Sequence, residues 1–265
     1  MLNKVVPLSF LVFFAICTNG YSQGEIDQQD KVFFRNERSF SGSLNSNGWG
    51  ANYRYAKRLS AFSSIVFDVD LASIRHPKEI KIQSLYLGGW GRSHVFGKAN
   101  EAFSIRAGTG YQKELFSKFD QGGISIRFFT VGGVSLALLK PVYFQKITKF
   151  NYLQTSAGVY AIPEEWESSL FDPAYMVDDS YIRDRESFFK GLGETTFLPG
   201  VFARAGLCFE YGNEDRLIHA LEGGLQIEGF LKKLPILATD DNSQLFLTLF
   251  VTYRFGKVID AKGQK

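Results

Sequence analysis

Apolar and polar residues alternate along segments of about ten residues, and this repeated period of two constrains the fold more than any other feature of the sequence. In the clearest segment, Gln244 to Phe255, the even positions mix polar groups with two phenylalanines. Every odd position there is apolar: Leu245, Leu247, Leu249, Val251, Tyr253 and Phe255. Because successive side chains of a strand point to opposite sides, this segment predicts a β-strand with one entirely apolar face.

The same alternation recurs upstream, with apolar residues on one face and polar or charged residues on the other. It covers residues 39–44, 49–55, 64–71, 103–112, 200–211 and 217–230. Residues 124–138 keep one apolar phase across Gly132-Gly133, which predicts a single long strand in which the glycines can accommodate a kink or bulge. The total is about eight strands.

These strands predict an all-β fold, a transmembrane antiparallel up-and-down β-barrel over residues 37–256. Connections expected at one end are short, namely 57–61, 115–121 and 212–215, whereas three at the other end are long, namely 74–100, 145–199 and 231–243. Only 45–48 is short at that second end. Short inner turns and long outer loops are typical of outer-membrane barrels. A soluble β-sandwich is the competing interpretation, although its outward faces should be polar.

The N-terminus predicts export. Lys4 precedes the apolar run Val5–Cys17, and small and polar residues lead to an expected cleavage near Ser22, so residues 1–22 read as a signal peptide. Residues 23–36 would form an N-terminal extension and residues 257–265 a C-terminal tail. We therefore expect the outer membrane of a Gram-negative bacterium. Cys208 would be the one cysteine left, too few for an internal disulfide.

The predicted inward faces carry five cations and five anions. They are Arg54, Arg106, Arg127, Arg204 and Arg254 with Asp68, Asp70, Glu210, Glu222 and Glu228. Charges removed from bulk water need partners, and an eight-stranded barrel is just wide enough to be filled by side chains. The matched inventory predicts an interior charge network and a plugged barrel rather than a pore lined by one sign of charge.

The loop 145–199 is the main candidate for an external function. It contains the acidic and aromatic run Glu164-Glu165-Trp166-Glu167, and a short helix is expected around residues 181–190. Phe188-Phe189 would anchor that helix on the barrel rim or on a partner, or the loop would simply cap the barrel.

No catalytic, metal or cofactor motif stands out. His76, His94 and His219 lack paired spacing, and neither a nucleophile elbow nor a phosphate loop is present. Gly191-Leu192-Gly193 is expected to end the loop helix. Asp178-Asp179 and Asp240-Asp241-Asn242 could attract calcium, but solvated turns are the preferred interpretation. The net charge of +3 has no basic block that suggests nucleic acid. We expect no enzyme activity and no cofactor.

The second half of the chain resembles a group of small, mostly uncharacterised outer-membrane β-barrel proteins of the Bacteroidota. The resemblance lies in residues 188–194, 198–206, 220–224 and 232–236, in the final 253–257, and in the signal ending at 21–23. It implies an outer-membrane location and leaves the activity open.

The sequence as a whole predicts a structural or accessory component of an outer-membrane assembly that acts through its outer loops. Its partners would be outer-membrane lipid, other outer-membrane proteins and the insertion machinery, for which Tyr253 and Phe255 would be the C-terminal strand signal. A small-solute pore and a rim-active outer-membrane hydrolase are the alternatives.

Overall fold

The computed structural model describes residues 35–83, 85–86, 89–90, 93–117, 123–156, 158–174, 176, 181–211 and 216–260. The predicted signal peptide, its cleavage point and residues 23–34 of the predicted extension lie outside this part of the chain, as does Asp178-Asp179.

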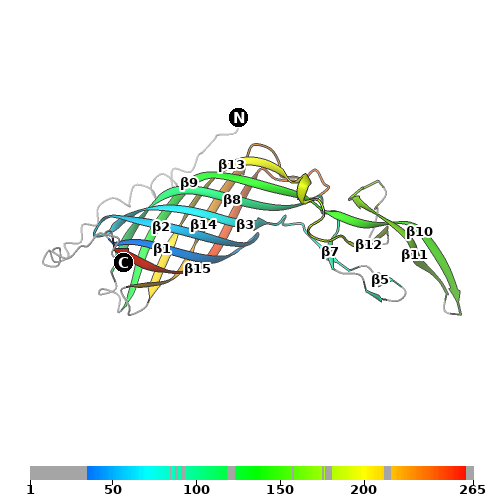
Figure 1. Ribbon diagram of the computed structural model, residues 1–265, viewed down its shortest axis with the longest axis horizontal. Helices are drawn as coiled ribbons and strands as arrows, with labels where there is room; N and C mark the ends of the chain where they lie inside the picture. The colour runs from blue at the N-terminus through cyan, green and yellow to red at the C-terminus, as the bar shows by residue number, and fades with distance from the viewer. Residues whose placement is uncertain are drawn as a thin grey trace, which may run out of the picture. The chain divides into compact units, whose positions relative to one another are not determined.

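Eight antiparallel strands close a barrel in the order β1-β15-β14-β13-β9-β8-β3-β2. Neighbours in the barrel are also neighbours in the order of these strands along the chain, so the predicted up-and-down β-barrel is confirmed (Figure 1). The strands are β1 (Arg35–Asn45), β2 (Gly48–Ser60), β3 (Ser63–Ile74), β8 (Asn100–Phe116), β9 (Ile124–Pro141), β13 (Thr196–Tyr211), β14 (Leu217–Phe230) and β15 (Leu245–Asp260).

β9 is one continuous strand, as its unbroken apolar phase predicted. Its register with β8 and with β13 runs through Gly132 and Gly133 without a shift, so the glycines carry no bulge. β15 runs further than predicted, because Lys257 to Asp260 continue to pair with β1 as far as Arg35. The predicted tail therefore begins four residues too early.

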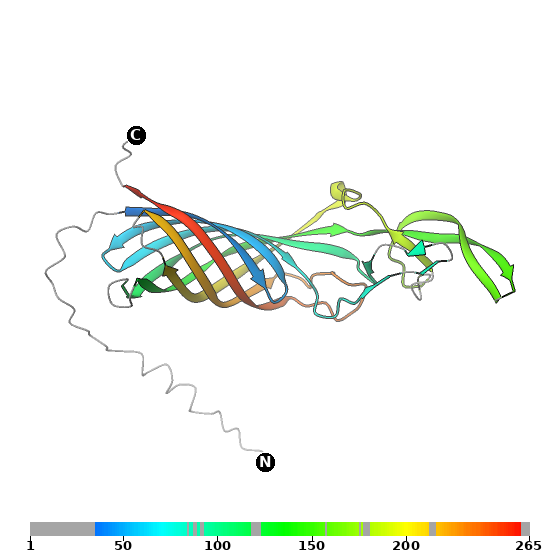
Figure 2. The same cartoon turned by 90° about the horizontal axis from the view of Figure 1, so that it is seen from below.

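The barrel has an apolar outer surface and a mixed inner one. The odd residues of β15 face outward, with Leu245, Leu247 and Leu249 exposed at 65%, 65% and 61%, while Thr248 and Arg254 face inward and are buried. The predicted apolar rows on the other strands are likewise exposed, including Phe67, Val69, Val201 and Leu225. Figure 2 shows the strands wrapping around the axis, which gives every strand one face toward the interior.

Large aromatic side chains occupy the interior at positions where a nearby strand carries glycine. The Phe202 ring lies over Gly108 and the Phe250 ring lies over Gly224, and each ring would be only 2.9 Å from a Cβ atom added to its glycine. Alternating large and small residues is how a narrow barrel fills its interior without voids.

The long connection between β9 and β13 forms its own sheet in the order β11-β10-β12. It consists of β10 (Tyr143–Thr155), β11 (Gly158–Leu170) and β12 (Ile182–Arg185), followed by a 3-10 turn at Leu192–Glu194. The helix predicted around residues 181–190 is wrong, because β12 pairs with β10 and Ile182 is buried in the root of this sheet. Gly191 therefore precedes the short turn instead of ending a helix.

Two small ribbons lie in the connection between β3 and β8. β4 (Lys81–Ile82) pairs with β7 (His94–Val95), and β5 (Leu85–Tyr86) pairs with β6 (Gly89–Trp90). Among the described residues, no helix has the length and apolar character needed to cross a membrane.

The glycine beneath Phe250 provides a test of this packing. We expect Gly224→Ala to lower the free energy of unfolding by about 1–3 kcal/mol, because the added methyl group would meet the Phe250 ring and the Ala205 carbonyl oxygen. The neighbouring Gly223→Ala, whose methyl group would meet nothing closer than 3.9 Å, is the control and should be nearly neutral. Urea unfolding in liposomes measures both. Equal stability of the two variants would contradict the packing.

Candidate functional site

All ten charged residues predicted to face inward lie inside the barrel. Nine are buried, and the Arg127 side chain is 13% exposed. The register places them on the inner faces of β2, β3, β8, β9, β13, β14 and β15, where the period of two turns them away from the apolar surface.

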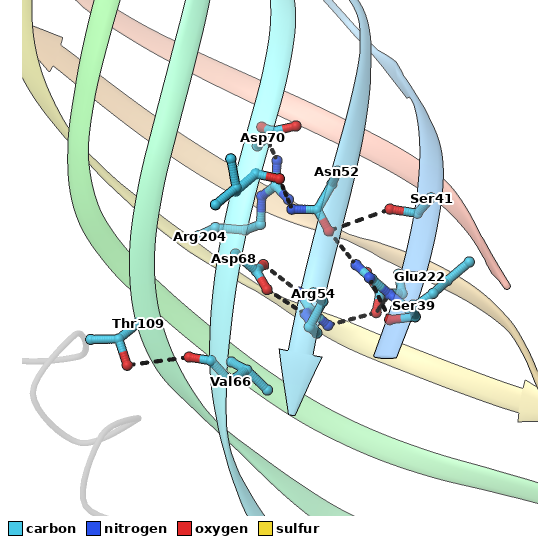
Figure 3. A network of polar contacts seen from close by, with 12 residues as sticks. Ser39, Ser41, Asn52, Arg54, Val66, Asp68, Asp70, Thr109, Arg204 and Glu222 are labelled. Carbon is cyan, nitrogen blue, oxygen red and sulfur yellow. Dashed lines mark hydrogen bonds and ion pairs between the residues drawn. The ribbon is translucent and has the colours of Figure 1, made fainter. Parts of the chain in front are cut away.

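A first ionic cluster joins four of these residues. Arg54 binds Asp68 with two parallel hydrogen bonds of 2.7 and 2.8 Å, and its remaining nitrogen donates to Glu222 at 2.8 Å (Figure 3). Arg254 donates to both oxygens of Glu222, at 2.7 and 3.0 Å, and to Asn52 at 3.0 Å. The cluster holds two cations and two anions and is neutral.

A second neutral cluster lies one step closer to the long loops. Arg106 donates to Glu228 at 3.0 and 2.6 Å and to Asp70 at 2.6 Å. Arg204 shares the same Asp70 oxygen at 3.0 Å and bonds Gln226 at 2.9 Å. The two clusters therefore account for eight of the ten predicted charges.

The third group contains a residue that the sequence did not single out. Arg127 lies 3.0 Å from Glu37 and 2.6 Å from Glu210. The sequence predicts that the barrel begins at residue 37 itself and assigns Glu37 to no face. β1 in fact begins at Arg35, and its register places Glu37 on the inner face. Beside this group, Arg58 pairs with Glu114 at 3.3 Å, and a cavity of about 10 Å³ has room for about one water molecule.

Aromatic rings fill the space around the first two clusters. The Arg54 guanidinium lies 4.6 Å from the centre of the Phe129 ring, and that of Arg204 lies 4.8 Å from Phe250. The two rings are themselves 6.4 Å apart. Guanidinium groups stack favourably on aromatic faces, so the planes that pair with carboxylates also pack the centre of the barrel.

The connection 231–244 covers the long-loop end of the interior. Leu234 and Ile236 are fully buried against the inner residues Ile74, Leu139 and Phe230. Asn242 holds the loop by accepting hydrogen bonds from the amides of residues 236 and 237 and donating to the carbonyls of residues 237 and 239. This end is therefore closed by an apolar plug.

The sheet of β10, β11 and β12 is fastened to the barrel rim by specific contacts. Arg185 of β12 pairs with Glu101 of β8 at 2.8 Å, and the Phe188 ring lies 6.3 Å from that of Phe103. The Tyr143 hydroxyl donates to Glu194 at 2.7 Å, which raises the pKa of Tyr143. Phe189 stays exposed, so of the two predicted anchors only Phe188 binds the rim.

Beyond its root, the β10–β11 hairpin presents exposed side chains. Tyr152 and Val159 are 69% and 64% exposed, and the predicted acidic run lies on β11. Lys149 lies 3.0 Å from Glu164 and 3.6 Å from Glu165, which raises the pKa of Lys149. Trp166 is stacked under Arg183, at 3.5 Å from the ring centre.

Within the described residues, no group of three or more His, Cys, Asp and Glu side chains could hold a metal ion. Cys208 is a buried, free thiol. The Asp240–Asn242 segment is a structural turn, in which Lys78 donates to Asp241 and lowers the pKa of that carboxyl group. The arrangement as a whole fills and seals a barrel.

Comparisons with known proteins give structural neighbours only. The chain matches no protein-family model and no curated protein. Among solved structures, Neisserial surface protein A is 6% identical, with 84% of this chain and 96% of that chain covered and a TM-score of 0.38. Ail, the attachment invasion locus protein of Yersinia pestis, is 7% identical, with 86% and 99% covered and a TM-score of 0.39. OprG from Pseudomonas aeruginosa is 9% identical, with 86% and 97% covered and a TM-score of 0.30.

The ion-pair network makes a quantitative prediction. Glu222→Gln should destabilise the barrel by about 3–5 kcal/mol, because it removes the anion shared by Arg54 and Arg254 in a site with only 1% exposure of the glutamate. Glu164→Gln, which removes an exposed partner of Lys149, is the control and should cost about 0–1 kcal/mol. Unfolding free energies in liposomes test both, and a Glu222 variant as stable as the control would contradict the network.

Proposed function

We propose that this protein is a sealed outer-membrane β-barrel that presents a β-hairpin as a docking element for an outer-membrane assembly. The observation that carries the proposal is the combination of an interior filled by ion pairs and aromatic rings with an apolar outer surface. In such a barrel the apolar side chains face outward and the charged side chains face inward, which is the opposite of a soluble protein.

The apolar surface has the height that a membrane requires. The outward row of β15 from Leu245 to Phe255 extends about 34 Å along the strand, or about 26 Å at the usual tilt of about 40°. Outer-membrane barrels carry an apolar band about 25 Å tall. A soluble β-sandwich would place such rows in contact with water, at a large cost in hydrophobic free energy.

The connection lengths favour one orientation. Turns such as Ala61-Phe62 join the strands at the end that holds Arg35 and Asp260, whereas the three long connections lie at the opposite end. By the usual asymmetry of these barrels, the short-turn end would face the periplasm and the hairpin would face the exterior.

The filled interior favours a structural role over a pore. Two neutral ionic clusters and the Phe129 and Phe250 rings stacked on them fill the middle of the barrel, and the Leu234-Ile236 plug closes its long-loop end. A conducting barrel would instead need a continuous polar path.

The exposed hairpin is the part best suited to a partner. β11 is an edge strand of its sheet, and edge strands offer unpaired backbone groups to another chain. The filled interior and the large loops favour an accessory role in a larger assembly. Outer-membrane lipid and the insertion machinery, which would read Tyr253 and Phe255, complete the proposed partners.

Membrane insertion and sealing can be tested together. We expect the mature protein to need detergent, to migrate faster on unheated gels than after boiling, and to give no stable current steps in planar bilayers because side chains fill the interior. A monomer that is soluble without detergent would contradict the membrane location. Large single-channel steps would contradict the sealed interior.

The hairpin can be tested by shortening it. Replacing residues 148–165 with an Asn-Gly turn removes the exposed half of β10 and β11 while keeping the root residues Val142, Phe144 and Ile182. Mild-detergent pull-downs from native membranes should recover partners with the full chain and lose them with the shortened one. Unheated gels check that the shortened barrel still folds. Retention of every partner by the shortened, folded variant would contradict the proposed role.

A further inference from the structure

The apolar outer surface is interrupted by a groove across β1, β2 and β3. Its volume is about 510 Å³, and its lining includes Phe40, Tyr53, Val69 and Leu71. The floor is formed by Gly42 and Ala51, which stand opposite each other in the register. Gly42 has no side chain and that of Ala51 is a single methyl group. The surface that would contact lipid is therefore recessed at these two positions.

A group of cations adjoins the short-turn end of this groove. Arg38 and Lys257 are directly opposite in the β1–β15 register, two residues beyond Phe40 and Phe255, which mark the aromatic end of the groove. Lys57 is a diagonal neighbour of Arg38 on β2. All three side chains are exposed on the outer face.

Within the part of the chain that the structure describes, these cations have no anion on their own face. The outward positions of β15, β1 and β2 within the described residues carry no Asp or Glu, and the adjacent Glu37 points inward to Arg127. Like charges directly opposite in a sheet destabilise it, so Arg38 and Lys257 favour an anion bound between them. Tyr55, opposite Arg38, adds a hydroxyl group in the same row.

We infer that this surface binds an anionic glycerophospholipid, with the phosphate on Arg38 and Lys257 and an acyl chain in the groove over Gly42 and Ala51. The inference rests on the proposed membrane location and orientation, which puts the cations at the headgroup level of the periplasmic leaflet. Clustered Lys and Arg beside an apolar surface are the usual recognition elements for anionic lipids.

The dimensions fit one leaflet. From Arg38 to Leu44, the first outward residue of β1 beyond the groove, β1 rises about 20 Å, or about 15 Å in depth at a tilt of about 40°. Half of an apolar band of about 25 Å is about 13 Å, so an acyl chain that begins at the level of Arg38 would end near Leu44. Trp49, which pairs with Leu44 and is 48% exposed, lies just beyond the groove, where the end of a bound acyl chain would reach.

Trp49 makes the binding measurable. The full mature chain would be refolded into phosphatidylcholine liposomes containing increasing fractions of chain-brominated phosphatidylglycerol or chain-brominated phosphatidylcholine, and tryptophan fluorescence recorded. We expect the anionic lipid to quench Trp49 at a several-fold lower mole fraction. The double variant Arg38→Gln/Lys257→Gln should abolish this preference, since each cation near an anionic lipid contributes about fivefold. The variant Trp49→Phe shows which part of the tryptophan fluorescence comes from Trp49.

Lys113→Gln is the matched control, because Lys113 is an exposed cation at the same end, on β8, and lies well along that strand from Ile105, the residue of β8 that lines the groove. It should keep the preference. Equal quenching by both lipids, an unchanged preference in the double variant, or an equal loss with Lys113→Gln would overturn the inference. The inference would also be overturned if unbrominated lipid A relieved the quenching by brominated phosphatidylglycerol more strongly than unbrominated phosphatidylglycerol does. A variant that does not insert shows no gel shift, which separates failed folding or a wrong membrane location from failed lipid binding.

Discussion

The barrel depends on neutralising charge in an interior that has almost no room for water. Arg54–Asp68 and Arg106–Asp70 are cross-strand pairs in the register, whereas Arg54–Glu222 and Arg204–Asp70 reach across the lumen. The first kind fixes the alignment of neighbouring strands and the second ties opposite walls together. A slip of one residue would turn these charges toward the apolar surface, so the network also excludes wrong registers.

Much of this architecture could be predicted from the sequence because it follows from a period of two. The alternation located all eight barrel strands and placed ten charges inside, since a residue's face depends only on its position in the strand. The partners could not be predicted, because Arg254 meets Glu222 only through the β14–β15 register. Glu37 escaped notice because strand ends are set by pairing, here with β15 and β2.

The loop sheet shows a different limit. β12 is a strand because it pairs with β10 and buries Ile182, and no local pattern in four residues can reveal a partner some forty residues away. The charged and aromatic residues around it favoured a helix instead. β10 and β11 did carry a readable signal in their aromatic and β-branched residues, but they belong to a connection that length alone marked as a loop.

Two of the three long connections at this end differ in what they do. The segment after β14 folds inward and buries Leu234 and Ile236, while the segment after β9 builds an exposed hairpin. One connection closes the interior of the barrel, and the other forms the exposed hairpin.

The hairpin begins almost where a barrel strand ends, because only Val142 separates β9 from β10. β9 is hydrogen-bonded along its length to β8 on one side and to β13 on the other. A force applied to the hairpin along β9 would therefore act in shear on the hydrogen bonds that join β9 to β8 and to β13. Many of these bonds would share the force at once. If the hairpin docks a partner as proposed, this continuity would let the barrel resist tension on that partner without separating strand by strand from its end.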